Sequence, residues 1–230
     1  MKIKSFYFTH LEILLFCGSV ALTVVPFFLF SNESLLSLFA SLVGISSLIL
    51  CAKGNPLGQV LMIVFSALYG IVSFQAAYYG EMLTYLGMSA PMALLSLISW
   101  LRHPYRGERR EVAVRPLTRA SLFTVLLLTA GVTALFIPLL SALGTARLLP
   151  STVSVATSLL AASLTYLRSP YYALAYAAND VVLILLWVLQ SLGDREAISV
   201  VTCFIAFLVN DLYGFFSWMR MARRQGRAHP

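Results

Sequence analysis

The sequence has little charge. Charged residues make up 11% of its 230 residues, whereas apolar residues make up 60%. A soluble domain of this size is usually about half apolar and a quarter charged. So few charged groups cannot cover a surface that faces water, and this excludes a soluble globular domain. The composition indicates an integral membrane protein whose partner is the lipid bilayer.

Cysteine and histidine are also scarce, and their spacing carries no recognisable chemistry. The three cysteines are Cys17, Cys51 and Cys203. They form no CxxC pair, and all lie in or at the ends of apolar runs. The three histidines are His10, His103 and His229. They lie in polar ends or loops without a zinc-binding spacing, and the chain has neither a Walker A sequence nor a GxSxG motif. The sequence therefore predicts no metal, no cofactor, no catalytic residue and no enzymatic activity.

Long apolar runs dominate the rest of the chain. A helix needs roughly 20 apolar residues to cross a bilayer core about 30 Å thick. Eight stretches qualify, and short breaks with polar or turn residues separate most of them. The stretches are Leu11–Phe30, Leu35–Ala52, Leu57–Tyr79, Leu83–Leu101, Ala120–Leu140, Thr152–Leu167, Tyr171–Leu192 and Ala197–Met219. The first follows Lys2 and Lys4, as in a signal peptide, but it is long and lacks a small-x-small site, so we expect a retained helix.

The basic residues gather on one side of the expected membrane. With eight crossings, one face collects 14 of the 16 Lys and Arg residues, and the other holds Arg147 and Arg195. The positive-inside rule makes the first face cytoplasmic. Both termini are then predicted on the cytoplasmic side of the cell (inner) membrane. Topology thus explains the net charge of +7, so no nucleic-acid partner is expected.

A short pattern recurs and predicts an internal repeat. Lys53-Gly-Asn-Pro56 precedes a helix pair that ends in Ser-Trp100-Leu-Arg, and Arg168-Ser-Pro170 precedes one that ends in Ser-Trp218-Met-Arg. The two Pro-to-Trp distances are 44 and 48 residues. Two like-oriented three-helix units need one extra crossing between them, which the stretch at 120–140 supplies. Such parallel repeats occur in transporters, with the substrate site between them.

The expected organisation is therefore an all-α membrane protein with an extra N-terminal helix and a 3+1+3 core of parallel repeats. Its predicted parts are the N-terminal helix (1–34), the first repeat (35–102), a basic cytoplasmic loop with the linker helix (103–149), the second repeat (150–220) and a basic cytoplasmic tail (221–230).

Asp180 is the clearest polar residue at membrane depth, because it lies ten residues into the seventh stretch. Ionisable groups there usually face a cavity or a partner. Asn179 precedes it, and Tyr172, Tyr176 and Trp187 share its helical face. An acid flanked by aromatic rings suits a flat, cationic ligand. The alternative is that Asp180 only bonds a neighbouring helix while the rings pack.

Further polar residues punctuate other stretches. Asn210 and Asp211 form a second pair nearer the cytoplasmic end, where they could gate the path, cap a neighbouring helix or join the site. Gln59 and Tyr69 in the third stretch are candidate binding residues. The remaining notable groups are expected to be structural. Pro91 and Pro138 should kink their helices, and Glu12 and Glu81 should be solvated near the membrane surface.

These residues together resemble the PnuC-type nicotinamide riboside transporters, also labelled nicotinamide mononucleotide transporters. The resemblance runs from about 35 to 220. It is carried by Lys53-Gly-Asn, Trp100, the Tyr176-to-Asp180 pattern with Trp187, and the ending Asn210-Asp-Leu-Tyr-Gly-Phe-Phe-Ser-Trp218. The resemblance implies a 3+1+3 fold similar to the SWEET sugar transporters and facilitated diffusion of a vitamin-like solute. It also implies a homotrimer and a cytoplasmic kinase that traps the solute without stable binding.

The sequence departs from that family at the seventh helix, where its members carry Trp-x-x-Trp-x-x-x-Asn. Aligning Asp180 to the amide places Tyr176 and Ala173 at the tryptophans, and aligning Asn179 places Ala175 and Tyr172 there. Neither restores the motif, so thiamine, riboflavin and deoxynucleosides join nicotinamide riboside as candidate solutes. A substrate-binding subunit of an ATP-driven vitamin importer is the alternative function; such subunits usually have about six helices. A sugar carrier remains open on architecture alone.

Overall fold

The computed structural model describes residues 7–30, 35–75, 79–145, 147–191 and 197–227, and helices dominate this part of the chain. The helices are α1 (His10–Phe30), α2 (Leu35–Ala52), α3 (Leu57–Gln75), α4 (Tyr79–Thr84), the π-helix η1 (Tyr85–Ser89), α5 (Ala90–Arg102), α6 (Arg119–Ala142), α7 (Leu148–Tyr166), α8 (Tyr171–Ser191) and α9 (Ala197–Arg227). Two short strands, β1 (Pro104–Tyr105) and β2 (Glu108–Val112), pair antiparallel.

The prediction of eight spans is confirmed. Among the described residues, eight helical segments are long and apolar enough to cross a membrane, with α4, η1 and α5 forming a single one. Several boundaries differ from expectation: α3 ends at Gln75 instead of Tyr79, and α7 begins at Leu148 instead of Thr152.

Two further differences concern the last helix and the loop after α5. The last helix continues to Arg227, so most of the predicted tail is helical, and the loop after α5 contains the β1–β2 hairpin. The hairpin was missed because Arg106 and Gly107, both at positive φ, make its turn within a run of charged residues.

The fourth span is irregular where Pro91 enters it. Proline has no backbone N–H to donate to the carbonyl four residues earlier, so a regular α-helix cannot continue through it undisturbed. Here the turn before the proline is π-helical, and α5 resumes with Pro91 in its first turn. Such π turns often occur at functional sites. Gly70 of α3 faces this turn, and a Cβ there would lie 2.6 Å from Leu86 Cγ, so α3 and η1 pack closely.

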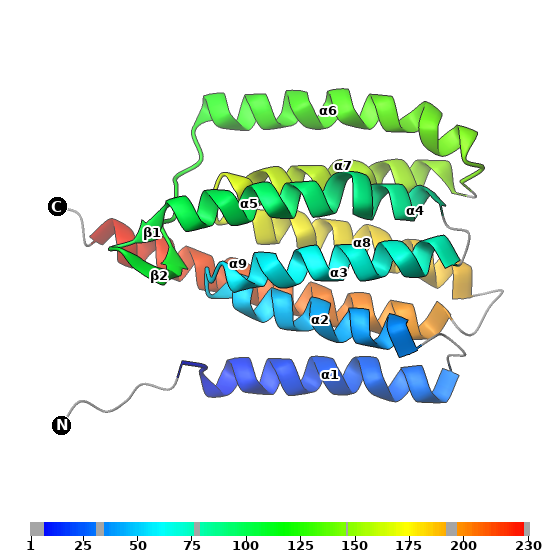
Figure 1. The fold of residues 1–230 in the computed structure, drawn as a ribbon, viewed down its shortest axis with the longest axis horizontal. Helices are drawn as coiled ribbons and strands as arrows, with labels where there is room; N and C mark the ends of the chain where they lie inside the picture. The colour runs from blue at the N-terminus through cyan, green and yellow to red at the C-terminus, as the bar shows by residue number, and fades with distance from the viewer. Residues whose placement is uncertain (1–6, 31–34, 76–78, 146, 192–196, 228–230) are drawn as a thin grey trace.

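The helices run roughly alongside one another, with α6 and α1 at opposite edges of the bundle (Figure 1). We call the end that carries β1 and β2 the hairpin end. The α2–α3 turn and the ends of α5 and α9 lie there too, and α1 begins there (Figure 1). The opposite end, which carries the α6–α7 turn, is called the cavity end. An even number of crossings returns the chain to the side where it started, as observed.

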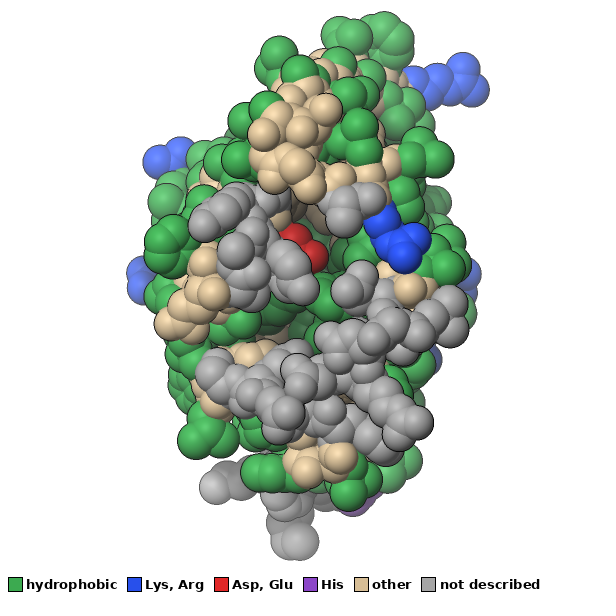
Figure 2. Space-filling view, turned by 90° about the vertical axis from the view of Figure 1, so that its right-hand side faces the viewer, with side chains coloured by type: hydrophobic (Ala, Val, Ile, Leu, Met, Phe, Trp, Pro, Cys, Tyr) green, Lys and Arg blue, Asp and Glu red, His purple; other side chains and the backbone are tan. Residues whose placement is uncertain are grey.

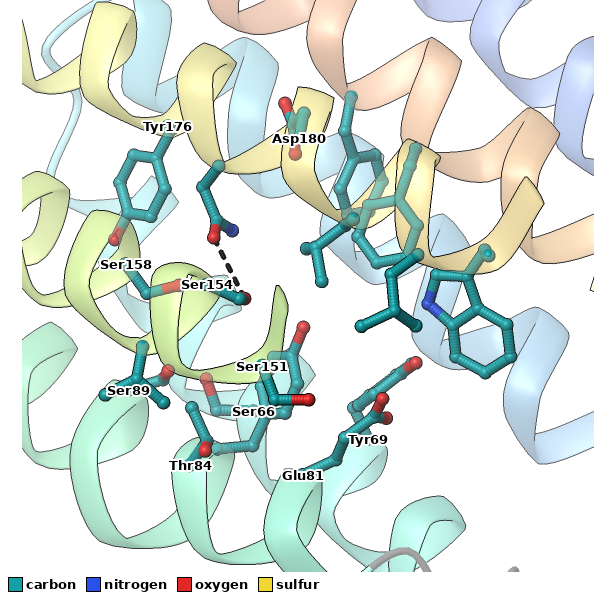
Figure 3. Close-up of a pocket in the computed structure, with 18 of the residues that line it drawn as sticks. Ser66, Tyr69, Glu81, Thr84, Ser89, Ser151, Ser154, Ser158, Tyr176 and Asp180 are labelled. Carbon is teal, nitrogen blue, oxygen red and sulfur yellow. Dashed lines mark hydrogen bonds between the residues drawn. The ribbon is translucent and has the colours of Figure 1, made fainter. Parts of the chain in front are cut away.

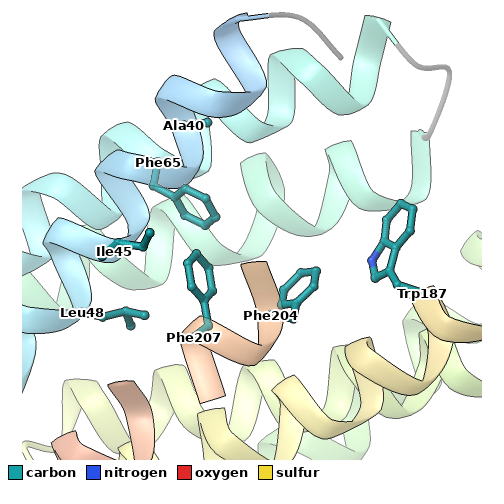
Figure 4. Close-up of a cluster of buried hydrophobic side chains, with 7 residues drawn as sticks. All are labelled: Ala40, Ile45, Leu48, Phe65, Trp187, Phe204 and Phe207. Carbon is teal, nitrogen blue, oxygen red and sulfur yellow. The ribbon is translucent and has the colours of Figure 1, made fainter. Parts of the chain in front are cut away.

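The core between the central helices is aromatic. Phe65 of α3 packs edge-on against Phe207 of α9, which packs edge-on against Phe204 (Figure 4). The cluster comprises Ala40, Ile45, Leu48, Phe65, Trp187, Phe204 and Phe207. It joins α2 and α3 to α8 and α9. Burying a large apolar side chain contributes about 1.5–3 kcal/mol against water, but within lipid the packing itself supplies the stabilisation.

The N-terminal helix is fastened to the hairpin end by a buried ion pair. Glu12 is 3% exposed, and its two carboxylate oxygens each accept a hydrogen bond of 3.0 Å from Lys53 Nζ. The hydroxyl of Tyr213 on α9 donates to the same carboxylate, and the Asn55 side chain contacts the Tyr7 hydroxyl at 2.6 Å. The expectation that Glu12 is solvated was therefore wrong, because Lys53 and Tyr213 satisfy it inside the protein.

At the hairpin end, two tryptophans donate hydrogen bonds that join each helix pair to the other. Trp100 Nε1 donates to the Thr165 carbonyl at 3.0 Å, and Trp218 Nε1 donates to the Cys51 carbonyl at 2.8 Å. The rings are fully buried and lie 5.3 Å apart. Each acceptor stands five residues before the proline of its turn, Pro56 or Pro170. Each helix pair therefore closes on the turn that begins the other one.

The segment after α5 forms a strap across both turns. The backbone N–H of Val112 donates to the Gly54 carbonyl at 3.0 Å, and that of Arg115 donates to the Arg168 carbonyl at 3.1 Å. Gln225 near the end of α9 holds the strap, because its side chain accepts from Val114 N and donates to Val112 O. The strap, defined as residues 103–117, thus closes the hairpin end with backbone hydrogen bonds to both turns.

Candidate functional site

A cavity of about 450 Å³ lies between α3, η1, α7, α8 and α9. Its volume falls within the range of about 300–1,000 Å³ that small-molecule sites occupy. Leu143, Gly144, Thr145 and Arg147, around the α6–α7 turn, also line it. Figure 2 looks onto the cavity end and shows acidic atoms in a gap between the surrounding side chains, with a basic side chain to one side of it. The cavity therefore opens at the end opposite the strap.

Helix α8 presents three polar residues to the cavity: Tyr176, Asn179 and Asp180. Figure 3 shows Tyr176 and Asp180 projecting from this helix. The Asn179 carbonyl oxygen accepts hydrogen bonds from Ser154 Oγ at 3.0 Å and from Thr157 Oγ1 at 2.8 Å. These contacts with α7 orient the Asn179 amide, so it is preorganised for a ligand.

Three carboxyl groups line the cavity. Asp180 of α8 and Asp211 of α9 both line it and are buried, with exposed fractions of 4% and 5%. The second oxygen of Asp180, Oδ2, is buried and has no hydrogen-bond partner in the described part of the chain. Glu81 of α4 lines the cavity beside Tyr69 of α3 (Figure 3). The one basic side chain among the lining residues is Arg147, which also donates to the Leu189 carbonyl.

Hydroxyl groups cover the facing wall. Ser151, Ser154 and Ser158 follow one another at helical spacing on α7 and point toward the cavity, and Thr84, Ser89 and Ser66 face them from α4, η1 and α3 (Figure 3). The Ser66 hydroxyl has no hydrogen-bond partner among the described residues. A row of hydroxyls opposite a carboxyl pair can bind a solute that carries several hydroxyls of its own.

Aromatic rings complete the site. Trp187, Phe204 and Phe207 close it on the side of the core cluster. Tyr69 and Tyr85 lie 4.5 Å apart, ring centre to ring centre, on the side of α3 and η1. The cavity thus combines acidic groups, hydroxyls and flat apolar surfaces, which is the arrangement for a polar solute with an aromatic ring.

Five of the eight residues predicted from the sequence line this cavity: Asp180, Asn179, Tyr176, Trp187 and Tyr69. The other three do not. Tyr172 packs against Trp218 at 4.9 Å, Gln59 donates to the Cys51 thiol, and Asn210 contacts Ser19 Oγ of α1 at 2.6 Å. Tyr172 shares the helical face of Tyr176 but lies one turn nearer the hairpin end, where the cavity has already closed.

Sequence reasoning missed several lining residues. Asp211 was left undecided and Glu81 was assigned to the solvated surface, yet both line the cavity. They reach the cavity from α9 and α4, so spacing along α8 could not reveal them. The α7 serines did carry a signal. They recur at positions i, i+3 and i+7, and they give α7 the lowest mean hydropathy among the eight spans. The serines that made this predicted span short are the residues that line the cavity.

Fold and site together define a multi-spanning membrane transporter for a small solute. The nicotinamide mononucleotide transporter family model matches residues 34–220, and the chain belongs to this family.

Two curated relatives of this chain are also named as transporters of this kind. The nicotinamide riboside transporter PnuC of Neisseria mucosa is 26% identical over 223 residues, which cover 94% of this chain and 83% of the relative. The transporter of the same name from Haemophilus influenzae is 24% identical over 193 residues, covering 84% and 82%. The fold is similar to the crystal structure of the vitamin B3 transporter PnuC, with a TM-score of 0.81 at 24% identity, covering 95% of this chain and 94% of that one.

Proposed function

We propose that this protein carries nicotinamide riboside, or a closely related cationic nucleoside-like solute, across the cell membrane by facilitated diffusion. The observation that carries the proposal is the carboxyl pair of Asp180 and Asp211, which lies at membrane depth inside a cavity that Tyr176 and Trp187 also line. A buried negative charge favours a cationic ring, and aromatic faces stack on it. Relatives that bear the name nicotinamide riboside transporter support this choice of solute.

Each part of such a solute has a counterpart in the cavity. The pyridinium ring would lie against Tyr176 and Trp187, with its charge near Asp180. The ribose hydroxyls would bond the α7 serines and Asn179, whose amide nitrogen is turned away from its two hydroxyl donors. No step in this mechanism makes or breaks a covalent bond, so binding and release alone are needed.

The protein would work by alternating access, and this structure would be its outward-open form. The hairpin end carries the basic turns and would face the cytoplasm by the positive-inside rule, with both termini there. The reciprocal indole bonds, Trp100 to Thr165 and Trp218 to Cys51, support two like-oriented repeats joined by α6. Gly54 and Arg168 support this further, because each adopts positive φ two residues before the proline of its turn. Rocking of the repeats would break the strap and close the cavity end.

The direct test is uptake of labelled solutes into proteoliposomes, with nicotinamide riboside, thiamine, riboflavin and a deoxynucleoside as the panel. We expect saturable uptake of nicotinamide riboside, inhibited by excess unlabelled compound. Replacing Tyr176 by Leu removes the ring but keeps apolar volume, so affinity should fall about 2- to 30-fold. The control is Y171L, because Tyr171 is 44% exposed on the same helix. Uptake of another panel member alone would reassign the substrate.

An ATP-driven importer subunit is disfavoured, because the eight spans exceed the usual six and match a transporter family over most of the chain. The proposed carrier needs no ATPase, so uptake should proceed in liposomes that contain this chain alone. The homotrimer and the kinase that traps the solute remain predictions of the family resemblance. Light scattering of the detergent-solubilised protein tests the first, and retention of solute in cells that lack the kinase tests the second.

A further inference from the structure

The cavity has an outer and an inner level, which follow from the positions of its lining residues along their helices. A helix rises about 1.5 Å per residue, so the distance of a residue from the cavity end of its helix gives its depth. Asp180 precedes Ser191, the last residue of α8, by eleven positions and lies about 16 Å from that end. Glu81, near the start of α4, lies about 3 Å from it, and Tyr69 and Tyr85 lie about 9 Å from it. Asp180 therefore belongs to the inner level and the other three residues to the outer one.

The three outer residues lie together on the side of α3, α4 and η1. The ring centres of Tyr69 and Tyr85 are 4.5 Å apart, with an angle of 49° between the ring planes. Phe65 meets the Tyr85 ring edge-on at 5.8 Å and supports it from behind. Glu81 lies beside Tyr69 (Figure 3), and it precedes Tyr85 by four residues, which places both on one helical face. A carboxylate beside two aromatic rings is a site for a cation, because the ring faces and the carboxylate both attract positive charge.

The basic groups of the chain do not occupy this place. The salt bridges in the described part of the chain lie at the hairpin end, and none of them involves Glu81. Arg147 also lines the cavity, but its guanidinium donates to the Leu189 carbonyl and is therefore held toward α8 instead of α4. An acid that forms no salt bridge at the mouth of a cavity raises the local concentration of cations from the surrounding water.

We propose that Glu81, Tyr69 and Tyr85 form an outer subsite, which a cationic solute occupies before it moves inward to Asp180. This rests on the proposed function, which supplies a solute with one positive charge. The outer subsite sets the rate of entry, because a negative potential at the mouth speeds the association of a cation. The inner level sets how long the solute stays, because Asp180 is 4% exposed and its Oδ2 has no hydrogen-bond partner among the described residues. The solute moves alone in both steps, so transport remains facilitated diffusion.

Stopped-flow fluorescence of the purified, detergent-solubilised chain separates these two roles, with Trp187 in the cavity wall as the reporter. E81Q keeps the shape of the side chain and removes its charge. We expect E81Q to slow the association of nicotinamide riboside about 3- to 10-fold at low salt and to change its dissociation rate less than about twofold. The difference in association should shrink at about 0.3 M salt, because ions screen the mouth. E108Q is the control, since Glu108 is an exposed carboxyl on the hairpin.

Two further comparisons test the cause of the effect. The dihydro form of nicotinamide riboside is neutral and nearly the same in shape, so E81Q should leave its association unchanged. Y85L should slow the association of the cation about two- to fivefold, whereas Y85F, which keeps the ring, should not. The Tyr85 variants also provide a test that does not depend on the folding of E81Q.

The failure of this subsite and the failure of the proposed function give different results. Binding of nicotinamide riboside with equal association rates in wild type and E81Q would overturn the outer subsite and leave the proposed function standing. Faster dissociation from E81Q with unchanged association, or equal slowing of the neutral form, would have the same consequence. Absence of binding to the wild-type chain, in a protein that elutes as a monodisperse species, would overturn both proposals.

Discussion

The two ends of this helical bundle differ in how their polar groups are satisfied. At the hairpin end, Trp100, Trp218 and the strap place hydrogen bonds on the carbonyls of two helix-connecting turns. In the cavity, the Ser66 hydroxyl and one Asp180 oxygen are buried without a hydrogen-bond partner among the described residues, and a solute could reach both. Buried polar groups normally have partners. The hairpin end also has such groups, on Arg168 and Ser169, but neither of these residues lines the cavity. The comparison teaches that backbone hydrogen bonds join the turns at the hairpin end, whereas the cavity end keeps space and polar groups for a solute.

The largest effect should come from adding a side-chain carbon where α2 and α3 touch at the hairpin end. A Cβ on Gly58 would lie 2.7 Å from the backbone nitrogen of Cys51 and 2.6 Å from its thiol, so α2 and α3 would have to separate. We expect G58A to destabilise the protein by about 1–3 kcal/mol or more, seen as a lower melting temperature in detergent. Ala at Gly131 of α6, with no atom near the new Cβ, should be neutral or stabilising. Equal melting temperatures for the two variants would contradict the close packing.

Replacing one tryptophan by phenylalanine removes the indole N–H but keeps an aromatic ring in place, and it should loosen the hairpin end. W218F leaves the Cys51 carbonyl buried without its donor, at a cost of about 1–3 kcal/mol. We expect faster maleimide labelling of the buried Cys51 in a background where Cys17 and Cys203 are replaced by Ser. W100F should act in the same way through the Thr165 carbonyl. Unchanged labelling in both variants would show that the indole bonds do not hold this end closed.

The strap should contribute less than the tryptophans, because most of its residues, other than the buried Val112, are at least partly exposed. Q225A removes the bonds of Gln225 to Val114 and Val112 and should cost about 0.5–1.5 kcal/mol. In transport terms, a weaker closure at the hairpin end should speed the conformational change and raise the maximal uptake rate with little change in affinity. R223A on the same helix turn is the control, since Arg223 is exposed. A fall in solute affinity alone would place Gln225 in a different role.

The smallest effect should come from a substitution at the cavity end. Thr157 donates one of the two hydrogen bonds that orient the Asn179 amide, and Ser154 donates the other. T157V keeps the shape of the side chain, and Ser154 still donates to the Asn179 amide. Nicotinamide riboside affinity should therefore fall only about two- to fivefold. T152V is the matched control, because Thr152 on the same helix bonds only the backbone of Leu148 among the described contacts. A loss as large as that of Y176L would mean that Thr157 binds the solute itself.

The sequence was sufficient for the spans, because crossing lipid demands about 20 apolar residues whatever the neighbours are. It also pointed to Asp180 and Tyr176, which line the cavity, because an acid at membrane depth with a ring one turn away is visible along a single helix. Asp211 and Glu81 reach the same cavity from other helices, so no pattern along the helix of Asp180 reports them.

Register along a helix explains the misplaced residues. Tyr172, Gln59 and Asn210 have the right chemistry, but they pack against Trp218, Cys51 and Ser19 instead of lining the cavity. Spacing along a helix predicts which side of the helix a residue faces. It does not predict how far along the helix a cavity extends. That depth is set here by the strap and the two tryptophans, whose contacts span more than 60 residues of sequence.

The most direct measurement compares the two ends in one membrane. A membrane-impermeant maleimide is added outside cells that express S151C in a background where Cys17 and Cys203 are Ser, and labelling of the new cysteine and of Cys51 is followed separately by mass spectrometry. We predict rapid labelling at position 151, slowed by nicotinamide riboside, and none at Cys51. Equal labelling of both sites, or labelling at 151 that the solute leaves unchanged, would contradict a solute cavity open at one end and sealed at the other.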